Sequence, residues 1–488
     1  MTTSKPKVSI QLTPDQLKAV ENIIEFLDDV DPDDYIFTMS GVGGAGKTTC
    51  IIEALRGRND ILGATVSHSA KAVLEESLGQ VATCVTLAQL LGLRQRIDED
   101  GQISFVPNPF QRNGKALPID SARILVIDEC SMIDKVTFNR ILSMKSKDCK
   151  VIFLGDVYQL PPIEGKEDSI TFTYTRSQLH KPVRYTGPIA DMGEVFRKEI
   201  DKINKGKQAA KHTINRWQYH TLGQKRRTSK LNEDGSGYIF LNDVGKAVDI
   251  AVNAFKASDD PNVIRMIGYK NASITKINDV TRAHLYAGPD GNPKDDLDQF
   301  MPGELVICDG GYSVVTTRDQ GETFTHNAIY NGQTFRVKGH IPIKNGPKGI
   351  PSIAMDLEPH VRMPEGTEVY ALDYEKGRHR YFDAINSLST AAKTDKRQWS
   401  RYYDYMSNWA KFDYAYALTS HKSQGRTFKD VIVFESDIMN LKKTSLKNKL
   451  QSLYVACTRA RRRVYIYNNE YDVDQSQLSD SIKKELGL

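Results

Sequence analysis

The chain has 488 residues, of which 40% are hydrophobic and 26% are charged, and its net charge is +5. This length exceeds one compact core, so several domains are expected, and the composition is that of a globular protein. No run of about eighteen apolar residues predicts a membrane span, and the N-terminus has no signal-peptide pattern. Six scattered cysteines without a Cys-x-x-Cys pair argue against a disulfide framework or a zinc site and for a reducing, cytoplasmic location. The mild positive charge permits a nucleic-acid partner without requiring one.

The first predicted element is a helix from Thr13 to Asp28, with one apolar face made of Leu17, Val20, Ile24 and Leu27. Short β-branched runs then recur and predict buried parallel strands at Ile61–Val66, Ile124–Asp128, Val151–Gly155, Val263–Gly268, Val431–Phe434 and Val464–Tyr467. Helical patterns separate most of these runs. The fold class is therefore α/β, with doubly wound parallel sheets.

Two stretches break this alternation. Arg94 to Ile119 is typical of a β-hairpin that turns at Asp98–Gly101, followed by a proline-rich return. The stretch from Thr334 to Trp409 begins with short β-like pieces between Gly/Pro turns and becomes aromatic and polar. It predicts a small β-barrel inserted in an α/β domain.

Residues 41 to 48 read GVGGAGKT, a complete phosphate loop. An apolar run from Tyr35 to Met39 precedes it and a helical pattern follows. Glycines allow successive backbone N–H groups to face one anion, and the start of the helix adds its positive end. Lys47 is expected to reach the β- and γ-phosphates, and the Thr48 hydroxyl to hold Mg²⁺. The alternative, a glycine-rich turn that binds nothing, is disfavoured by the order strand, loop, helix.

Polar side chains follow two further predicted strands. Asp128 and Glu129 end one strand, where Asp128 is expected to bind Mg²⁺ and Glu129 to orient and deprotonate water. A helix N-cap is the alternative role for this pair. Gln159, in the run GDVYQLPP after the next strand, is placed to contact the γ-phosphate.

With DECSM at 128–132, that run resembles motifs II and III of superfamily 1 helicases. Further runs resemble other motifs of the family in order: TPDQ at 13–16, TVSHSAK at 65–71, Leu179 to Arg184, ALTSHKSQG at 417–425 and LYVACTRAR at 453–461. The similarity is greatest to the 5′→3′ branch (superfamily 1B, RecD/Pif1-like), and within it to the Dda-like helicases of T-even bacteriophages. One departure is Thr86-Leu87-Ala88, where the family usually has Thr-Ile-His.

The resemblance implies ATP and Mg²⁺ as cofactors and assigns a set of nucleotide contacts. Gln16 would read adenine, although Thr13, Pro14 and Gln16 also form a helix capping box. Arg184 and Arg459 would be arginine fingers from outside the phosphate-loop sheet, so that the site closes when two domains meet. The implied cofactor-binding residues are Gln16, Gly43, Gly44, Ala45, Gly46, Lys47, Thr48, Thr49, Gln424 and Gly425.

The resemblance also implies a groove for single-stranded DNA. Backbone contacts are expected from Ser67, His68, Lys71, Thr86, Thr419, His421 and Lys422. Trp399 and Tyr403 are chosen for base stacking, although several aromatics of this stretch must belong to the core. Phe105 would be the duplex-splitting wedge, or alternatively would pack the hairpin onto the body.

The implied organisation is two RecA-like domains, 1–86 with 121–195 and 196–333 with 412–488. The wedge would be 87–120 and an SH3-like barrel 334–411. The implied function is an ATP-dependent 5′→3′ DNA helicase and single-strand translocase. The alternatives are an ATP-switched single-strand-binding accessory and a RecD-like subunit of a nuclease complex. Expected partners are single-stranded DNA, its junctions with duplex and a phage single-strand-binding or replication protein; a monomer in the bacterial host cytoplasm, without membrane contact, is expected.

Overall fold

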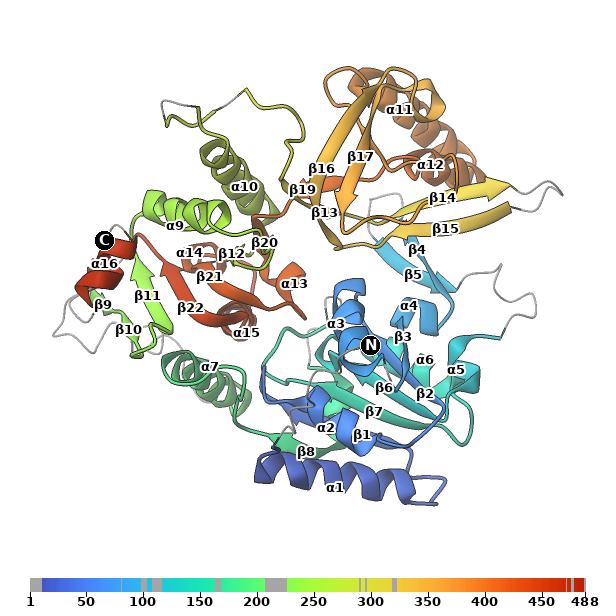
Figure 1. The fold of residues 1–488 in the computed structure, drawn as a ribbon. Coiled ribbons are helices and arrows are strands. Elements are labelled where there is room, and N and C mark those ends of the chain that lie inside the picture. The colour runs from blue at the N-terminus through green and yellow to red at the C-terminus, as the bar shows by residue number, and fades with distance from the viewer. Residues whose placement is uncertain are drawn as a thin grey trace, which may run out of the picture. The chain divides into compact units, whose positions relative to one another are not determined.

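The computed structural model describes residues 11–79, 81–97, 103–107, 116–162, 168–206, 226–288, 291–294, 296–317, 323–470, 472–474 and 478–486. The chain forms two compact units. The first comprises Met1–Val66, Ala70–Arg96 and Ser104–Thr186, and the second comprises Gly187–Leu488 with the short segments Ser67–Ser69 and Ile97–Ile103. Figure 1 labels the elements of both units.

The first unit is built on a six-stranded parallel sheet in the order β3-β2-β6-β7-β1-β8. Its strands are β1 (Ile36–Gly41), β2 (Ile61–Thr65), β3 (Thr83–Thr86), β6 (Ile124–Asp128), β7 (Lys150–Gly155) and β8 (Thr175–Leu179). The helices are α1 (Pro14–Asp28), α2 (Lys47–Ala54), α3 (His68–Leu78), α4 (Leu87–Leu90), α5 (Pro118–Ser121) and α6 (Lys135–Met144), with 3-10 turns η1 (Cys130–Met132) and η2 (Ile170–Tyr174). One core packs α1, α2 and α3 on one face of the sheet, and a second core includes α4 to α6 on the other.

Helix α1 has its predicted bounds, but its predicted apolar face is only half right, because Val20 and Leu27 pack into the core while Leu17 and Ile24 are exposed. The buried residues are Gln16, Ala19, Val20, Ile23 and Phe26. By contrast, Leu17 is 50% exposed and Ile24 is 37% exposed. The capping box with Thr13 turns Gln16 inward, and the residues one and two turns further along that side of the helix follow it into the core.

The second unit contains a six-stranded sheet in the order β10-β11-β22-β21-β12-β20, which is parallel except for β10. Its strands are β10 (Lys230–Leu231), β11 (Gly237–Leu241), β12 (Ile264–Gly268), β20 (Ala417–Thr419), β21 (Phe428–Phe434) and β22 (Ala460–Tyr467). Its helices are α7 (Pro188–Asn204), α9 (Val244–Lys256), α10 (Asn271–Leu285), α13 (Ser420–Ser423), α14 (Glu435–Met439), α15 (Leu446–Cys457) and α16 (Asp480–Leu486). A parallel pair joins β9 (Arg226–Thr228) to β23 (Asp472–Asp474). The predicted α/β class with parallel sheets is confirmed.

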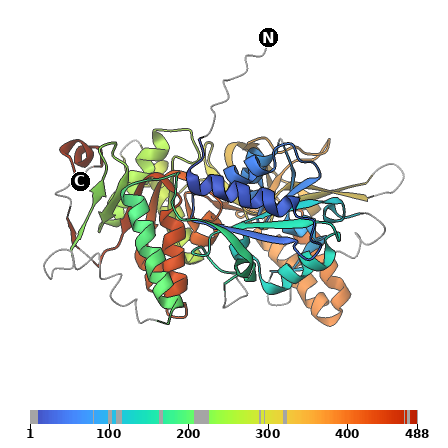
Figure 2. The same ribbon diagram turned by 90° about the horizontal axis from the view of Figure 1, so that it is seen from below.

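The division between the units lies at Thr186/Gly187 and not at 195/196 as predicted. The predicted position falls inside α7, a continuous helix that starts after Gly187 (φ 61) with Pro188 at its first turn. Helix α7 packs beside α15 of the second unit, as Figure 2 also shows. A boundary inside α7 would separate part of this helix from the rest of its packing on α15. The boundary therefore falls at Gly187, directly before the helix.

An antiparallel five-stranded sheet, β18-β17-β16-β13-β19, is inserted in the second unit. Its strands are β13 (Leu305–Cys308), β16 (Thr334–Ile343), β17 (Ser352–Glu358), β18 (Tyr370–Leu372) and β19 (Phe412–Tyr414), beside the hairpin β14 (Tyr312–Thr317) and β15 (Thr323–Ile329). The 3-10 turn η3 (Pro347–Gly349) and the helices α11 (Arg378–Thr394) and α12 (Trp399–Met406), joined by η4 (Lys396–Gln398), complete it. The insert therefore extends beyond the predicted bounds 334–411, because β13 and β19, its two ends, pair with each other. Closure into a barrel stays a prediction.

The predicted hairpin corresponds to the paired strands β4 (Leu93–Ile97) and β5 (Ile103–Pro107). Its predicted turn at 98–101 and much of the proline-rich return lie outside the described residues. All six cysteines are buried free thiols. Within the described ranges, no helix is long and apolar enough to span a bilayer.

Candidate nucleotide and nucleic-acid sites

The phosphate loop joins β1 to α2. Gly44 and Gly46 have φ angles of 75° and 84°, a region that side chains disfavour. A Cβ atom at Gly46 would lie 2.4 Å from the Nε2 atom of Gln16. The Lys47 ammonium donates to the carbonyl oxygen of Gly41 at 2.7 Å and lies 3.4 Å from that of Val42. Lys47 therefore lies over its own loop, and Thr48 and Thr49 form the first turn of α2 beside it.

Gln16 connects α1 to this loop. Its Nε2 donates to the carbonyl oxygen of Ala45 at 2.9 Å, and its Oε1 accepts from the backbone N–H of Thr13 at 2.9 Å. The amide is buried in this position. The capping role is confirmed, while the adenine contact stays a prediction.

The acidic pair lies where predicted, at the end of β6, with β7 between β6 and the loop strand β1. Burial raises the pKa of Asp128, and the charges of Lys47 and Arg184 oppose this rise. The carboxylate accepts a 2.8 Å hydrogen bond from the backbone N–H of Glu129. Glu129 itself has φ 56° and ψ 40°, a left-handed conformation that costs a non-glycine residue about 1 kcal/mol or more.

The side-chain oxygens of Thr48 and Asp128 fit a magnesium ion bound with nucleotide. Mg²⁺ in such sites takes one or two protein oxygens and completes its shell with phosphate and water. Burial raises the pKa of the half-buried Asp128 carboxylate, so a cation would offset the cost of keeping it charged, and the Thr48 hydroxyl is the matching neutral ligand. Across the described part of the chain, no group of three or more His, Cys, Asp or Glu side chains forms another candidate metal site.

Asp156 is a site residue that sequence reasoning missed. It follows β7, is 1% exposed and accepts a 2.8 Å hydrogen bond from the backbone N–H of Gly43 in the phosphate loop. Gln159 is buried three residues further on, where its backbone N–H donates to the Asp156 carbonyl oxygen at 3.0 Å. The only signal for Asp156 in the sequence was its position at the end of a predicted strand, three residues before Gln159.

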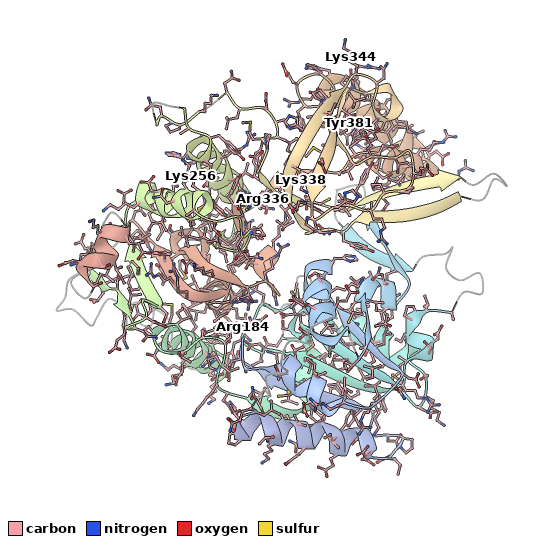
Figure 3. The ribbon with its side chains drawn as sticks, in the orientation of Figure 1. Arg184, Lys256, Arg336, Lys338, Lys344 and Tyr381 are labelled. Carbon is pink, nitrogen blue, oxygen red and sulfur yellow. The ribbon has the colours of Figure 1, made fainter. Side chains whose placement is uncertain are left out.

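Arg184 belongs to the unit that carries the phosphate loop, so the expectation that it comes from outside the phosphate-loop sheet is wrong. It follows β8, which pairs with β1. The backbone N–H groups of Val183 and Arg184 donate to the carbonyl oxygen of Gly44 at 2.8 and 3.1 Å. Figure 3 labels Arg184. Only Arg459 is therefore left to come from the second unit.

In the second unit, Gln424 and Gly425 end helix α13, with Gly425 at φ 74°. Arg459 is 3% exposed and donates through Nε to the carbonyl oxygen of Val455 at 3.1 Å. A second nitrogen of Arg459 lies 3.3 Å from the carbonyl oxygen of Arg426. The Arg426 guanidinium in turn bonds Thr334 Oγ1 at 2.8 Å and the Gly332 carbonyl oxygen. Backbone carbonyls thus hold both arginines in this unit.

The predicted DNA contacts of the first half of the chain lie at strand ends. Ser67 follows β2, and His68 begins α3. Lys71 pairs with Glu75 at 3.0 Å. Thr86 is buried as the N-cap of α4, where its hydroxyl accepts from the backbone N–H of Gln89. The side chain of Phe105, in β5, lies outside the described part of the structure.

The predicted contacts of the second half each have a protein partner. Thr419 caps α13, and burial lowers the pKa of His421. The ammonium of Lys422 lies 3.5 Å from Asp309 and 3.7 Å from Asp413.

Trp399 and Tyr403 lie on α12 with their rings stacked, 5.8 Å between centroids. Figure 3 also labels Tyr381 of α11, whose ring lies 5.1 Å from that of Trp409. Trp409 and Tyr381 thus belong to the core between sheet and helices, and Trp399 and Tyr403 stay predictions for base stacking.

Parts of the chain match two family models, and the chain is similar to several known proteins. Residues 11–218 match the family described as "AAA domain", and residues 414–467 match "UvrD-like helicase C-terminal domain". The chain is 25% identical over 458 residues to "ATP-dependent DNA helicase dda" of Enterobacteria phage T4, covering 88% of this chain and 93% of the relative. It is 37% identical over 91 residues to a RecBCD enzyme subunit RecD of Buchnera aphidicola, covering 19% and 13%. A crystal structure of Pif1 helicase from Bacteroides with ADP-AlF3 and ssDNA has a TM-score of 0.44 at 16% identity, covering 98% of each chain.

The phosphate loop and the acidic pair at the end of β6 are features of a phosphate-loop enzyme. In sequence, the chain is similar to the Dda helicase of phage T4 and, over a shorter stretch, to the RecD subunit of Buchnera aphidicola.

Proposed function

We propose that this chain couples ATP hydrolysis to 5′→3′ movement along single-stranded DNA and to the separation of duplex strands. The observation that supports this most is the convergence of Lys47, Asp128 and Arg184 on one loop. Asp128 interacts electrostatically with both cations, and Glu129, directly after it, is the proposed base. These groups suit ATP hydrolysis, because together they provide a phosphate-binding loop, a metal ligand and a general base.

The proposed roles follow from the chemistry of each side chain. Lys47 and the loop N–H groups bind the phosphates, and Gln159 contacts the γ-phosphate. Glu129 takes the proton of the attacking water, while Arg184 and, from the second unit, Arg459 neutralise charge on the transferred group. Mg²⁺, held through Thr48 and Asp128, would neutralise phosphate charge when bound.

The proposed DNA contacts lie directly after strands of both parallel sheets. Ser67 and His68 follow β2, and Thr419 to Lys422 follow β20. In the amino-acid sequence, these positions are close to the nucleotide-binding segments of each unit. Closure of the units around ATP and their reopening after hydrolysis would then advance the strand.

An unwinding assay tests this proposal. The full chain with ATP and Mg²⁺ should separate a duplex that carries a 5′ single-stranded tail, and Lys47→Ala should not. A matched duplex with a 3′ tail should remain paired; preferential separation of that substrate would reverse the polarity. Hydrolysis stimulated by DNA without any strand separation would favour the ATP-switched accessory or a RecD-like subunit that needs other chains.

A further inference from the structure

Thr65, the last residue of β2, carries a hydroxyl that no role above uses. Its side chain is fully buried, and its Oγ1 atom has no hydrogen-bond partner within the part of the chain that the structure describes. A buried hydroxyl without a partner destabilises the folded state, so its presence calls for an explanation. Thr65 is also absent from the predicted nucleotide and DNA contacts.

The sheet register places Thr65 beside the acidic pair. Thr65 and Asp128 are partners across the parallel strands β2 and β6. Partnered residues of neighbouring strands, which lie about 4.8 Å apart, project from the same face of a sheet. Ile61 and Ile124, four residues earlier in the same register, project from this face into the core formed with α1, α2 and α3. Thr65 and Asp128 therefore lie on the face covered by α2, the helix that begins at Lys47.

Thr65 is close in the chain to Ser67 and His68, two of the proposed contacts with single-stranded DNA. Ser67 follows it by two residues, and α3 begins at His68. Because β2 is parallel and buried along its length, the sheet holds its last residue, Thr65, in place. A movement of the start of α3 at His68 would thus reach Thr65 through three peptide units.

Asp128 provides the next connection. Its Oδ1 atom accepts from the backbone N–H of Glu129, and the left-handed backbone of Glu129 is a conformation that non-glycine residues disfavour. The orientation of the Asp128 carboxylate therefore controls where the backbone, and with it the side chain, of Glu129 points.

We propose that Thr65 is a positioning residue that couples strand binding at Ser67 and His68 to the catalytic carboxylates. When single-stranded DNA holds the start of α3, the Thr65 hydroxyl donates to the Asp128 carboxylate, which fixes Asp128 and, through its bond to the backbone of Glu129, the proposed base. This inference rests on the proposed DNA-dependent hydrolysis. It explains why a hydroxyl stays buried without a partner in the protein alone.

The test removes the hydroxyl without changing the shape of the side chain. Thr65→Val and Thr65→Ser in the full chain are compared with wild type for ATP hydrolysis with and without saturating oligo-dT. The readout is the ratio of stimulated to unstimulated kcat. We expect Thr65→Val to lower this ratio about tenfold, the effect of one hydrogen bond worth about 1.4 kcal/mol, without raising the KM for ATP. Thr65→Ser should restore the ratio to within about twofold of wild type.

Two controls separate this role from packing. Thr281→Val changes another fully buried threonine, in α10, whose hydroxyl bonds its own helix, and should leave the ratio at the wild-type value. The thermal midpoint of Thr65→Val should equal or exceed that of wild type, because no hydrogen bond is lost in the protein alone. Thr65→Ala serves as a second variant that lacks the hydroxyl and should show the same lowered ratio.

An unchanged ratio in both Thr65→Val and Thr65→Ala overturns the inference and leaves the proposed function standing. A lowered ratio that Thr65→Ser fails to restore also overturns it, since packing would then be the cause. Wild-type hydrolysis that oligo-dT fails to stimulate would overturn the proposed function and this inference together.

Discussion

The backbone N–H of Gly43 donates a 2.8 Å hydrogen bond to the buried carboxylate of Asp156, so the segment after β7 holds the phosphate loop in place. The two residues are 113 positions apart in the chain. The same carboxylate accepts from the backbone N–H of Tyr158 at 3.1 Å. Asp156 thereby connects the loop that binds phosphate to the turn that carries Gln159.

Asp156→Ala should weaken both the fold and nucleotide binding. The substitution leaves the Gly43 N–H without its buried acceptor, which costs about 1–3 kcal/mol in the free energy of unfolding. The loosened loop should raise the KM for ATP. Denaturant unfolding and steady-state hydrolysis measure the two effects. Asp156→Asn keeps an acceptor oxygen and should lose less of both; equal losses in the two variants would show that the hydrogen bond is not what matters.

Glu129→Gln should separate ATP binding from hydrolysis. Glutamine keeps the size of the side chain but cannot take a proton from water, so kcat should fall by about 10²–10⁴. The affinity for a fluorescent ATP analogue should stay within about threefold of wild type, because the phosphate cradle is intact. Lys47→Ala is the comparison variant and should lose this affinity. A Glu129→Gln protein that hydrolyses ATP at the wild-type rate would assign the base to another group.

Asp309→Asn should strengthen binding to single-stranded DNA. The Asp309 carboxylate pairs with Lys411 at 2.9 Å and with Lys422 at 3.5 Å, and its removal makes Lys422 more available to phosphate. The slope of log K against log salt concentration, measured by fluorescence anisotropy, should become more negative by about 0.7, the value for one additional phosphate contact.

Two further variants control this measurement. Adding Lys422→Ala to Asp309→Asn should remove the gain that comes from Lys422, and a gain that persists would come from Lys411, the other partner of Asp309. Glu194→Gln frees Lys198 on α7, a helix outside the proposed DNA segments, and should leave the slope unchanged. An equal gain in Glu194→Gln would mean that net charge, and not Lys422, determines the affinity.

The stability of the fold should depend on pH through His421. Burial lowers the pKa of His421 below its ordinary value of 6.5, so the folded protein resists a proton that the unfolded chain accepts. Its share of the free energy of unfolding is therefore fully present above the ordinary pKa of 6.5 and is lost as the pH falls through the lowered pKa of the folded state. Urea unfolding at a series of pH values should show this decrease. His421→Gln should flatten the curve in that range; parallel curves for both proteins would contradict the assignment.

Local patterns predicted the parts of this molecule that depend on local chemistry. The loop from Gly41 to Thr48 lies between a strand and a helix as predicted, and Asp128 ends its strand. Thr13 and Gln16 form the predicted capping box. Each depends on the conformational preferences and hydrogen bonds of residues within a few positions, which the sequence displays directly.

The same reasoning could not predict interactions between segments that are far apart in the sequence. The apolar residues of α1 are compatible with more than one buried face, and packing of Phe26 on Phe37 selects a face that leaves Leu17 exposed. The inserted sheet begins before its predicted start because Val306 pairs with both Phe335 and Tyr414. Which strand pairing or helix packing forms depends on all the alternatives that the whole chain offers. No local sequence pattern therefore identifies the one that is most stable.

The amino-acid sequence by itself predicted nucleotide binding, the side chains expected at the phosphates and the parallel α/β sheets that carry them, because these follow from backbone freedom, charge and periodicity over short stretches. Only the tertiary structure decided that the backbone of Arg184 bonds Gly44, that Asp156 holds Gly43 and that Thr65 lies beside Asp128. Those relationships arise from the order and register of strands, which burial of the whole core selects.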